Sequence, residues 1–395
     1  MDFDLSDEQQ LLYDSALAYF RAELGPLVER MDREDVWPDE IWSICARQGY
    51  LGAAIPEAYG GSGGDYMTAA LICQAMTRVS PAAALSVGAH LNLCAHNLMR
   101  NGTEEQRQRY LPKLASGEWV GALALTEPDA GSDAMGIRTT ARREGDHYVL
   151  NGSKMWITNG PNADVLVVYA KTDPDAGSRG ITAFILESGM PGFGVARKLD
   201  KVGMRGSPTG ELFFQDVRVP SSHVLGVENQ GVKVVMSGLD LERAFFACSG
   251  LGVMEESLEI ALRYAQERSQ FGQPIANFQL IQAKLADIYA NLQAARLGAY
   301  HALLRIQGGH RASLEAAAAL LFTAENAMDA ADQALQIHGG YGYIKEFPIE
   351  RIWRDTKLFE IGAGTNEIRR LLIARELLGQ RGHQDASAGA AARAR

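Results

Sequence analysis

The segment FEIGAGTNEIRR, residues 359–370, combines small and charged residues in a pattern that could carry chemistry. The small residues at 362–364 lack bulk, so a ligand could approach the backbone here, or the chain could simply turn. Glu360 and Glu367 flank them and could supply a carboxylate. The segment therefore indicates close backbone contact with a ligand and leaves open which carboxylate acts on it.

A further candidate carboxylate lies in the segment GLDLERAFFA, residues 238–247, which is otherwise apolar and has helical spacing. Glu242 has Phe246 one helical turn after it on the same face. A carboxylate among apolar neighbours is unfavourable unless it is paired, and burial would raise its pKa toward the range of a general base. The alternative is an ordinary ion pair of Glu242 with Arg243 or Lys233.

Two segments with the pattern of strands and turns carry groups that could bind a heterocycle. In LALTEPDAGSD, the hydroxyls of Thr126 and Ser132 and the N–H groups of the turns could bind a ring or an anion. In MWITNG, alternation puts Trp156 and Thr158 on one side of a strand, which suits a planar ring. Taken alone, each segment is more simply a hairpin turn or a core tryptophan.

Two glycine-containing connections could bind phosphates. ERSQFGQPIANFQ joins two long helical patterns, and its Arg268 and Gln279 could reach phosphates or amides, or could be a solvated connection. LQIHGGYGY, residues 335–343, contains a Gly-Gly loop that would admit a phosphate or a partner chain, or would only cap a helix. No G-x-G-x-x-G follows a predicted strand, so a Rossmann nucleotide site is not supported.

The composition excludes several classes of protein. The 395 residues are 47% hydrophobic and 22% charged, which indicates a globular protein of two or three domains. A net charge of -10 disfavours nucleic-acid and anionic-membrane binding. The four cysteines have no metal-ligand spacing, so we expect reduced, buried thiols and no metal site. Without a signal sequence or a long apolar run, we expect a cytoplasmic location, or an organellar matrix if a transit peptide was removed.

Periodicity divides the chain into the domains that must position these residues. Residues 1–118 have helical spacing, and Ser6 is the expected N-cap of the first helix. Residues 119–231 contain short β-branched runs separated by turns, which predicts a central antiparallel β domain, a small barrel or sandwich. Residues 232–380 return to long helical segments typical of a bundle, and residues 381–395 are predicted to be disordered. The predicted fold class is mainly α with this central β domain.

In this order, the segments resemble the acyl-CoA dehydrogenase flavoprotein family over about residues 5–380. Within the family the chain is most similar to the isovaleryl-CoA dehydrogenase branch, through GAHLNLCAHN, LNGSKMWITNGP, DKVGMRGSPTGELFF, VVMSGLDLER and EIGAGTNEIRR. The resemblance implies an N-terminal helical domain, a barrel-like middle β domain and a C-terminal four-helix bundle. It also implies a homotetramer that binds FAD between the β domain and the bundle.

The resemblance assigns the cofactor contacts residue by residue, with the phosphate and adenosine contacts contributed by a neighbouring subunit. The flavin ring and ribityl chain are assigned to Leu123, Leu125, Thr126, Gly131, Ser132, Trp156, Ile157 and Thr158. The phosphates and adenosine are assigned to Arg268, Gln279, Gln336, Ile337, His338, Gly339 and Gly340. The pocket is completed by Thr365, Asn366 and Glu367.

The reaction implied by the resemblance is α,β-dehydrogenation of an acyl-CoA thioester to the 2-enoyl-CoA, with the flavin as hydride acceptor. Many relatives carry the catalytic base in the loop position that Ala363 occupies here, whereas the isovaleryl branch carries it on a bundle helix, at the position of Glu242. We therefore expect Glu242 to be the base, near a thioester oxygen that accepts from a loop N–H group. The residues expected to contact the acyl-CoA are Ser132, Ser178, Asp240, Arg243, Phe246, Ala363 and Gly364.

The acyl chain is predicted to be short or medium and branched. Gly362 and Ala363 leave room for a methyl branch, whereas Phe246 is larger than the aliphatic residue usual in isovaleryl enzymes and would shorten or reshape the pocket. Apart from Arg243, no arginine is expected near the cleft, which disfavours a dicarboxylyl-CoA. Electron-transfer flavoprotein is the implied electron acceptor. The alternatives are an acyl-CoA oxidase, a desulfinase without the base, which Glu242 disfavours, and a non-enzymatic FAD- or CoA-binding scaffold.

Overall fold

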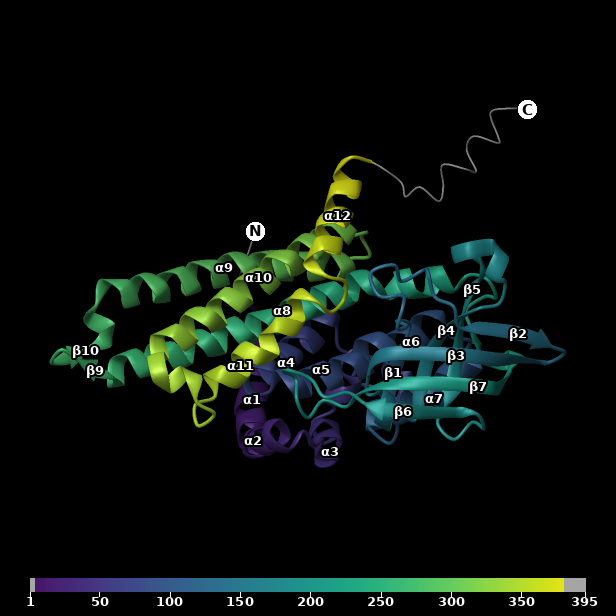
Figure 1. Cartoon of the computed structure of the whole chain (residues 1–395), viewed down its shortest axis with the longest axis horizontal. Coiled ribbons are helices and arrows are strands. Elements are labelled where there is room, and N and C mark those ends of the chain that lie inside the picture. The colour runs from purple at the N-terminus through teal and green to yellow at the C-terminus, as the bar shows by residue number, and fades with distance from the viewer. Residues whose placement is uncertain (1–3, 380–395) are drawn as a thin grey trace.

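The computed structural model describes residues 4–379, so the predicted disordered tail, residues 381–395, lies outside the described range. The chain is mainly helical, with long helices toward one end and a β-sheet domain at the other (Figure 1). The predicted order of helical domain, β domain and helical domain is confirmed. Within residues 4–379 no helix is long and apolar enough to cross a lipid bilayer.

The N-terminal helices begin at capping residues that the sequence contains. Ser6 caps α1 (Asp7–Glu23), as predicted: its side chain accepts from the Gln9 N–H, and the Gln9 side chain accepts from the Ser6 N–H. Thr103 and Gln106 form the same capping box at α7 (Glu104–Ser116). The remaining helices of this domain are α2 (Gly25–Glu34), α3 (Glu40–Arg47), α4 (Tyr66–Val79), α5 (Pro81–Gly88) and α6 (His96–Asn101).

Two features of this domain differ from the sequence prediction. The pattern over residues 81–102 predicts one helix, whereas a π-helical turn, Ala89–Ala95, lies between α5 and α6. Helix α2 was not predicted, because it opens with a Gly-Pro pair that is typical of a turn. Pro26 is tolerated there because the first turn of a helix has no intrahelical acceptor for its N–H groups.

The middle domain is an eight-stranded sheet with the order β6-β7-β3-β2-β4-β5-β8, and β1 pairs with β4. Its pairs are antiparallel, as predicted, except that β1 runs parallel to β4 and β2 meets β4 in parallel at one residue pair. The exposed edge strand β6 was not predicted, because it has little apolar content. The strands are β1 (Gly121–Ala124), β2 (Thr140–Glu144), β3 (His147–Thr158), β4 (Val165–Lys171), β5 (Ile181–Glu187), β6 (Phe193–Lys198), β7 (Thr209–Pro220) and β8 (Val224–Leu225).

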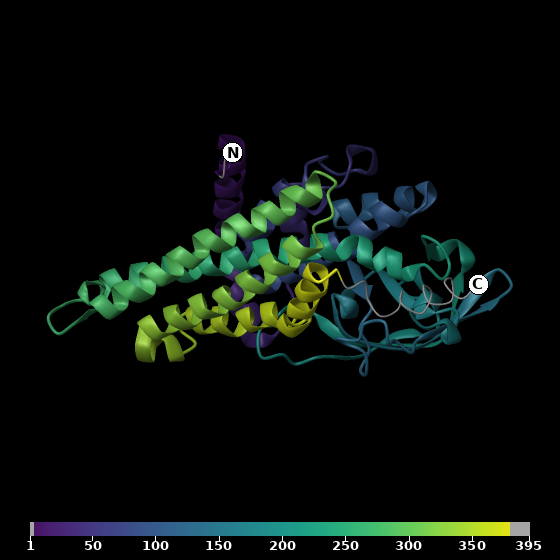
Figure 2. The same cartoon turned by 90° about the horizontal axis from the view of Figure 1, so that it is seen from above.

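The C-terminal domain is built on three long helices that run side by side (Figure 2). Helix α8 alone has 37 residues and is therefore about 55 Å long. A short hairpin closes the end of the domain that lies farthest from the β domain (Figure 1). The elements are α8 (Gly231–Glu267), β9 (Ser269–Gln270), β10 (Gln273–Pro274), α9 (Gln279–Gln307), α10 (Ser313–His338), α11 (Ile349–Thr356) and α12 (Asn366–Leu377).

Two hydrophobic cores meet along α8. The larger core packs the N-terminal helices against the C-terminal bundle and includes Leu241 and Ala244. The second core packs α6, α7 and the sheet against the first turns of α8, through Val234 and Val235. The part of α8 around residue 240 therefore lies where all three domains come together.

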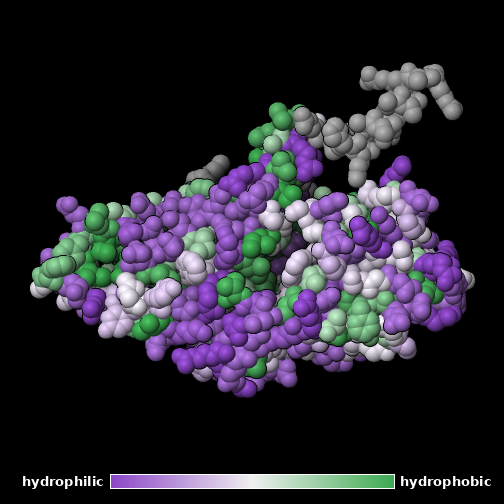
Figure 3. All heavy atoms as spheres, viewed as in Figure 1, coloured by the Kyte–Doolittle hydropathy of each residue, from purple (hydrophilic) through white to green (hydrophobic). Residues whose placement is uncertain are grey.

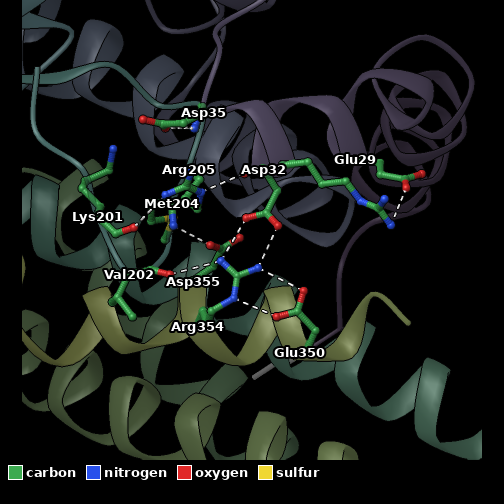
Figure 4. Close-up of polar contacts among 12 residues, drawn as sticks. Glu29, Asp32, Asp35, Lys201, Val202, Met204, Arg205, Glu350, Arg354 and Asp355 are labelled. Atoms are coloured by element: carbon green, nitrogen blue, oxygen red, sulfur yellow. Dashed lines mark hydrogen bonds and ion pairs between the residues drawn. The ribbon is translucent and has the colours of Figure 1, made fainter. Parts of the chain in front are cut away.

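Arg354 of α11 joins the same three domains through polar contacts (Figure 4). Its guanidinium donates to both carboxylate oxygens of Asp32 in α2, at 2.7 and 2.9 Å, and to the carbonyl of Val202, between β6 and β7, at 3.1 Å. The neighbouring Asp355 accepts from the backbone N–H of Met204, and burial raises the pKa of that carboxyl to about 7. These contacts fix the connection between β6 and β7 against the bundle.

Candidate active site

Glu242 lies twelve residues into α8 and forms no ion pair within residues 4–379. Arg243 pairs with Asp240 instead, at 3.1 Å, and Lys233 donates to the side chain of Gln230 at 2.7 Å. The interpretation of Glu242 as an ordinary ion-pair partner is therefore wrong. The residue as a whole is half-buried.

The electrostatic surroundings of Glu242 favour a protonatable base. Burial raises the pKa of Glu242 from its ordinary 4.5 to about 7, although the charges of Arg243 and Arg369 lower it. On the sheet side, Tyr169 of β4 is buried, and burial together with the charge of Glu242 raises the pKa of its hydroxyl. The carboxylate is thus within electrostatic reach of α8, α12 and the β domain.

Arg369 is a site residue that the sequence prediction missed. Its side chain is 1% exposed, and it donates to the carbonyl of Phe359 at 2.9 Å and to the side chain of Asn366 at 2.6 Å. It also donates to the carbonyl of Gly362. The expectation that Arg243 is the sole arginine near the cleft is wrong, because Arg369 also lies close enough to Glu242 for its charge to lower the pKa of that carboxyl.

The clamped loop has an unusual backbone. Ala363 has a φ of 55°, a conformation that residues with a side chain seldom adopt, and Gly364 has a φ of 88°. Neither N–H group makes a hydrogen bond of normal geometry with another described residue. A strained loop with available N–H donors is typical of a ligand site. The small residues at 362–364 would therefore let an oxygen atom of a ligand come close to these donors.

One side of the loop is closed by aromatic rings. Phe246 stacks on Phe359 with ring centroids 4.3 Å apart and an angle of 18° between the planes. A Cβ added at Gly362 would come within 3.4 Å of the Phe246 ring. Phe246 and Gly362 are therefore neighbours in the structure.

The two predicted flavin-ring segments lie on the sheet. Trp156 is 58% exposed and has a φ of 58° at a bulge in β3, so the interpretation as a core tryptophan is wrong. Thr158, two residues on, lies on the same accessible side of the strand. The loop after β1 presents Gly131 and Ser132 at its exposed tip, and the face seen in Figure 3 is hollowed between this domain and the bundle.

The predicted phosphate contacts lie at the opposite end of α8. A cleft of about 660 Å³ is bordered by Arg268, Ile337, His338, Gly339 and Gly340. Arg268 follows Glu242 by 26 residues, which corresponds to about 39 Å along the helix. One chain therefore does not bring the two predicted halves of the cofactor site together.

The cleft has the surface that a phosphate group would need. A Cβ added at either glycine of the loop would meet no atom within 4 Å, so the backbone is open to a ligand. The Arg268 guanidinium lies 5.3 Å from the centre of the Tyr341 ring. Gln279 is the exposed first residue of α9, and Gln336 is exposed near the end of α10.

The other predicted residues have more structural roles. Thr365 caps α12 by accepting from the Ile368 N–H at 3.3 Å, and Glu367 is exposed in the first turn of that helix. Asp240 accepts from Ser313 at 2.6 Å as well as from Arg243, so it holds the side chain of Arg243 in place. The remaining predicted contacts are the partly buried Leu123 and Leu125, the loop residue Thr126, the strand residue Ile157, and Ser178 in the 3-10 turn Pro174–Gly180.

This fold and site define a flavin-dependent oxidoreductase. Three family models match the chain: the acyl-CoA dehydrogenase N-terminal domain at residues 6–118, the middle domain at 122–217 and the C-terminal domain at 229–378. The chain belongs to the acyl-CoA dehydrogenase family, whose members are FAD-dependent oxidoreductases acting on CH–CH groups.

Individual relatives agree with this family over nearly the whole chain. The mitochondrial isovaleryl-CoA dehydrogenase of Pongo abelii is 49% identical over 375 residues, covering 94% of this chain and 89% of that one. The mitochondrial 2-methylacyl-CoA dehydrogenase of Solanum tuberosum is 47% identical, covering 94% and 91%. A solved FAD complex of PigA has a TM-score of 0.92 at 33% identity, covering 97% of this chain and 100% of that one.

Proposed function

We propose that the chain removes the α-proton and the β-hydride of a short, branched acyl-CoA, with Glu242 as the base. The observation that carries the proposal is a half-buried glutamate with a pKa of about 7 that feels the charge of Arg369, the residue that holds the loop carbonyls. In that loop the N–H groups of Ala363 and Gly364 make no hydrogen bond with another described residue. A base with a pKa near the working pH is deprotonated often enough to act and strong enough to take a proton. No other carboxylate of the loop is free for this role, because Glu360 pairs with Lys357 and Glu367 lies in the first turn of α12.

The loop at 362–364 would stabilise the charge that develops on the thioester oxygen. The α-proton of a thioester is weakly acidic, so its removal needs donors at the oxygen, each contributing about 3 kcal/mol. Ala363 and Gly364 have such donors, and Arg369 holds the carbonyls of this loop so that the donors keep their direction. The strained backbone at Ala363 would thus serve to point its N–H group at the thioester oxygen.

The cofactor contacts are proposed to come from two chains. FAD supplies the hydride acceptor when bound. Trp156, Thr158 and the tip of the loop after β1 would hold the flavin ring, and the Arg268 cleft of a neighbouring chain would hold the phosphates and adenosine. On one chain about 39 Å of α8 separates Glu242 from Arg268. This separation supports such an assembly, which a homotetramer would provide.

The substrate is proposed to have a short, branched acyl group such as isovaleryl or 2-methylbutyryl. The stacked rings of Phe246 and Phe359 would limit the depth of the acyl pocket, and Gly362 adds no side chain of its own beside them. Ser132, Ser178 and Arg243 would contact the thioester and the CoA chain. We propose electron-transfer flavoprotein as the acceptor that reoxidises the enzyme.

The proposal is tested by anaerobic bleaching of the bound flavin with a panel of isovaleryl-, 2-methylbutyryl-, isobutyryl-, butyryl-, octanoyl- and citronellyl-CoA. We expect the short branched esters to bleach the flavin absorbance fastest. Absence of bleaching by every ester would refute the substrate class. Fast reoxidation by air after bleaching would instead identify an oxidase.

A further inference from the structure

An ion pair buried inside the β domain has no role in the reaction described above. The ammonium of Lys154 in β3 lies 2.8 Å from the carboxylate of Glu127, in the loop after β1. The Lys154 side chain is 0% exposed and that of Glu127 is 7% exposed. Two charges this deeply buried call for a physical reason, because an apolar pair of similar volume is often as stable.

The pair joins the two ends of the loop after β1 to each other and to strand β3. The ammonium of Lys154 donates to the carbonyl of Leu125 at 2.9 Å as well as to Glu127. The Glu127 carboxylate accepts from the backbone N–H groups of Arg138 at 2.6 Å and Thr139 at 3.0 Å. One lysine and one glutamate therefore hold both ends of the loop 125–139 against β3.

Both groups are charged near neutral pH. Burial lowers the pKa of Lys154 to about 8, and the neighbouring Glu127 opposes that shift. Burial alone would raise the pKa of Glu127, but the Lys154 charge and the backbone donors hold it below its ordinary value. The contacts are consequently charge-assisted hydrogen bonds, which are stronger and more directional than neutral ones.

The residues held by the pair are the ones assigned to the flavin ring. Trp156 follows Lys154 by two residues and is 58% exposed, and the N–H of the intervening Met155 donates to the carbonyl of Thr126 at 2.9 Å. Ser132, at the tip of the fastened loop, is exposed. The pair thus links the two segments that would face the ring from one side and leaves their ligand-facing groups open.

We propose that Lys154 and Glu127 are positioning residues that preform the flavin-ring cradle before the cofactor binds. The proposal rests on the proposed assignment of the ring contacts to residues 123–132 and 156–158. Binding to a preformed cradle avoids the loss of conformational freedom that ordering the loop would otherwise require. The pair itself does not touch the reacting atoms.

The test uses a double substitution, because loss of one partner alone leaves an unpaired buried charge and can prevent folding. The variant Lys154→Met with Glu127→Gln removes both charges and keeps similar volumes. The matched control is Arg197→Met with Glu211→Gln, which removes an exposed pair at 2.9 Å from β6 and β7 of the same sheet. The measurements are the FAD dissociation constant by flavin fluorescence, the visible circular dichroism of bound flavin and the melting temperature of the apoprotein.

We expect the double variant to bind FAD at least tenfold more weakly, with altered flavin dichroism and an apoprotein melting temperature close to that of the wild type. The control should bind FAD as the wild type does. A double variant with wild-type FAD affinity and dichroism overturns the proposal, whatever its melting temperature. If the wild-type chain itself does not bind FAD, the assignment of the ring contacts is wrong as well. The proposed function is tested separately by Glu242→Gln, which should lose turnover while its FAD affinity stays normal.

Discussion

Replacement of Glu242 by glutamine separates the chemical role of the carboxylate from its effect on the fold. Glutamine keeps the volume and cannot take a proton at the substrate. General bases typically contribute 10²- to 10⁴-fold to turnover, so we expect kcat to fall by at least about 100-fold. FAD binding and flavin colour should be retained, because Glu242 is not among the residues assigned to the cofactor.

The same substitution should stabilise the protein, and the gain should depend on pH. The displacement of the Glu242 pKa from 4.5 to about 7 corresponds to about 3 kcal/mol of destabilisation of the ionised form in the folded protein. Between these pH values the folded chain keeps a proton that the unfolded chain releases. The stability of the wild type therefore falls as the pH rises from 4.5 to 7, and the full penalty is present above pH 7.

Urea unfolding of the wild type and of Glu242→Gln at pH 5 and pH 8 measures this difference. The variant should be more stable by a small amount at pH 5 and by up to about 3 kcal/mol at pH 8. Glu360→Gln is the matched control in the adjacent loop, where the carboxylate pairs with Lys357 near the surface. It should show neither the loss of turnover nor the pH-dependent gain.

Two results would refute the assignment of Glu242. A variant that keeps more than half of the wild-type kcat would show that another group takes the proton. An equal stability difference at pH 5 and pH 8 would show that the carboxyl is ionised in the folded chain at both pH values. The physical premise, a desolvated acid beside two arginines, would then be incorrect.

Three further predictions follow from the same geometry. Phe246→Leu removes the ring that stacks on Phe359, so the ratio of kcat/KM for octanoyl-CoA to that for isovaleryl-CoA should rise by about tenfold, and an unchanged ratio in the acyl-CoA panel would place the end of the pocket elsewhere. Arg369→Met removes a positive charge that lowers the Glu242 pKa, so the pH at which kcat/KM reaches half its maximum should move upward by about one unit; a shift to lower pH would contradict the stated electrostatics. Arg354→Met leaves the 9%-exposed carboxylate of its α2 partner unpaired, so the free energy of unfolding should fall by about 3 kcal/mol with FAD affinity retained, and an unchanged urea midpoint would mean that this junction adds no stability.

The order of domains and the position of Glu242 could be predicted from the sequence because each depends on local spacing. An acidic residue in a largely apolar helical stretch can be recognised within a window of about ten residues. The N-cap at Ser6 can be recognised within four residues. The placement of Phe246 one helical turn after Glu242 was also predicted from the spacing alone, whereas its stacking on Phe359 was not. These features need no knowledge of which segments meet in three dimensions.

The residues that the sequence prediction missed depend on contacts between distant segments. Arg369 and Arg370 are adjacent and chemically alike, yet Arg369 is buried against the loop while Arg370 pairs with Glu325 in another helix. In the sequence, Lys154 is indistinguishable from an exposed lysine of a strand. Only the structure shows that it is buried against Glu127, 27 residues earlier. In both cases burial depends on which face of the helix or strand is turned toward segments that are distant in the sequence. A short window of sequence does not contain that information.

The length of α8 has a genetic consequence under the proposed two-chain assembly. A subunit with a defective Glu242 still offers an intact phosphate cleft, and one with a defective Arg268 still offers an intact base. Mixing two inactive mutant proteins would then regenerate working sites, because each hybrid interface can pair the sound half of one chain with the sound half of the other. Complementation between null alleles is thus expected, because a single α8 is too long to contribute residues from both of its ends to the same cofactor site.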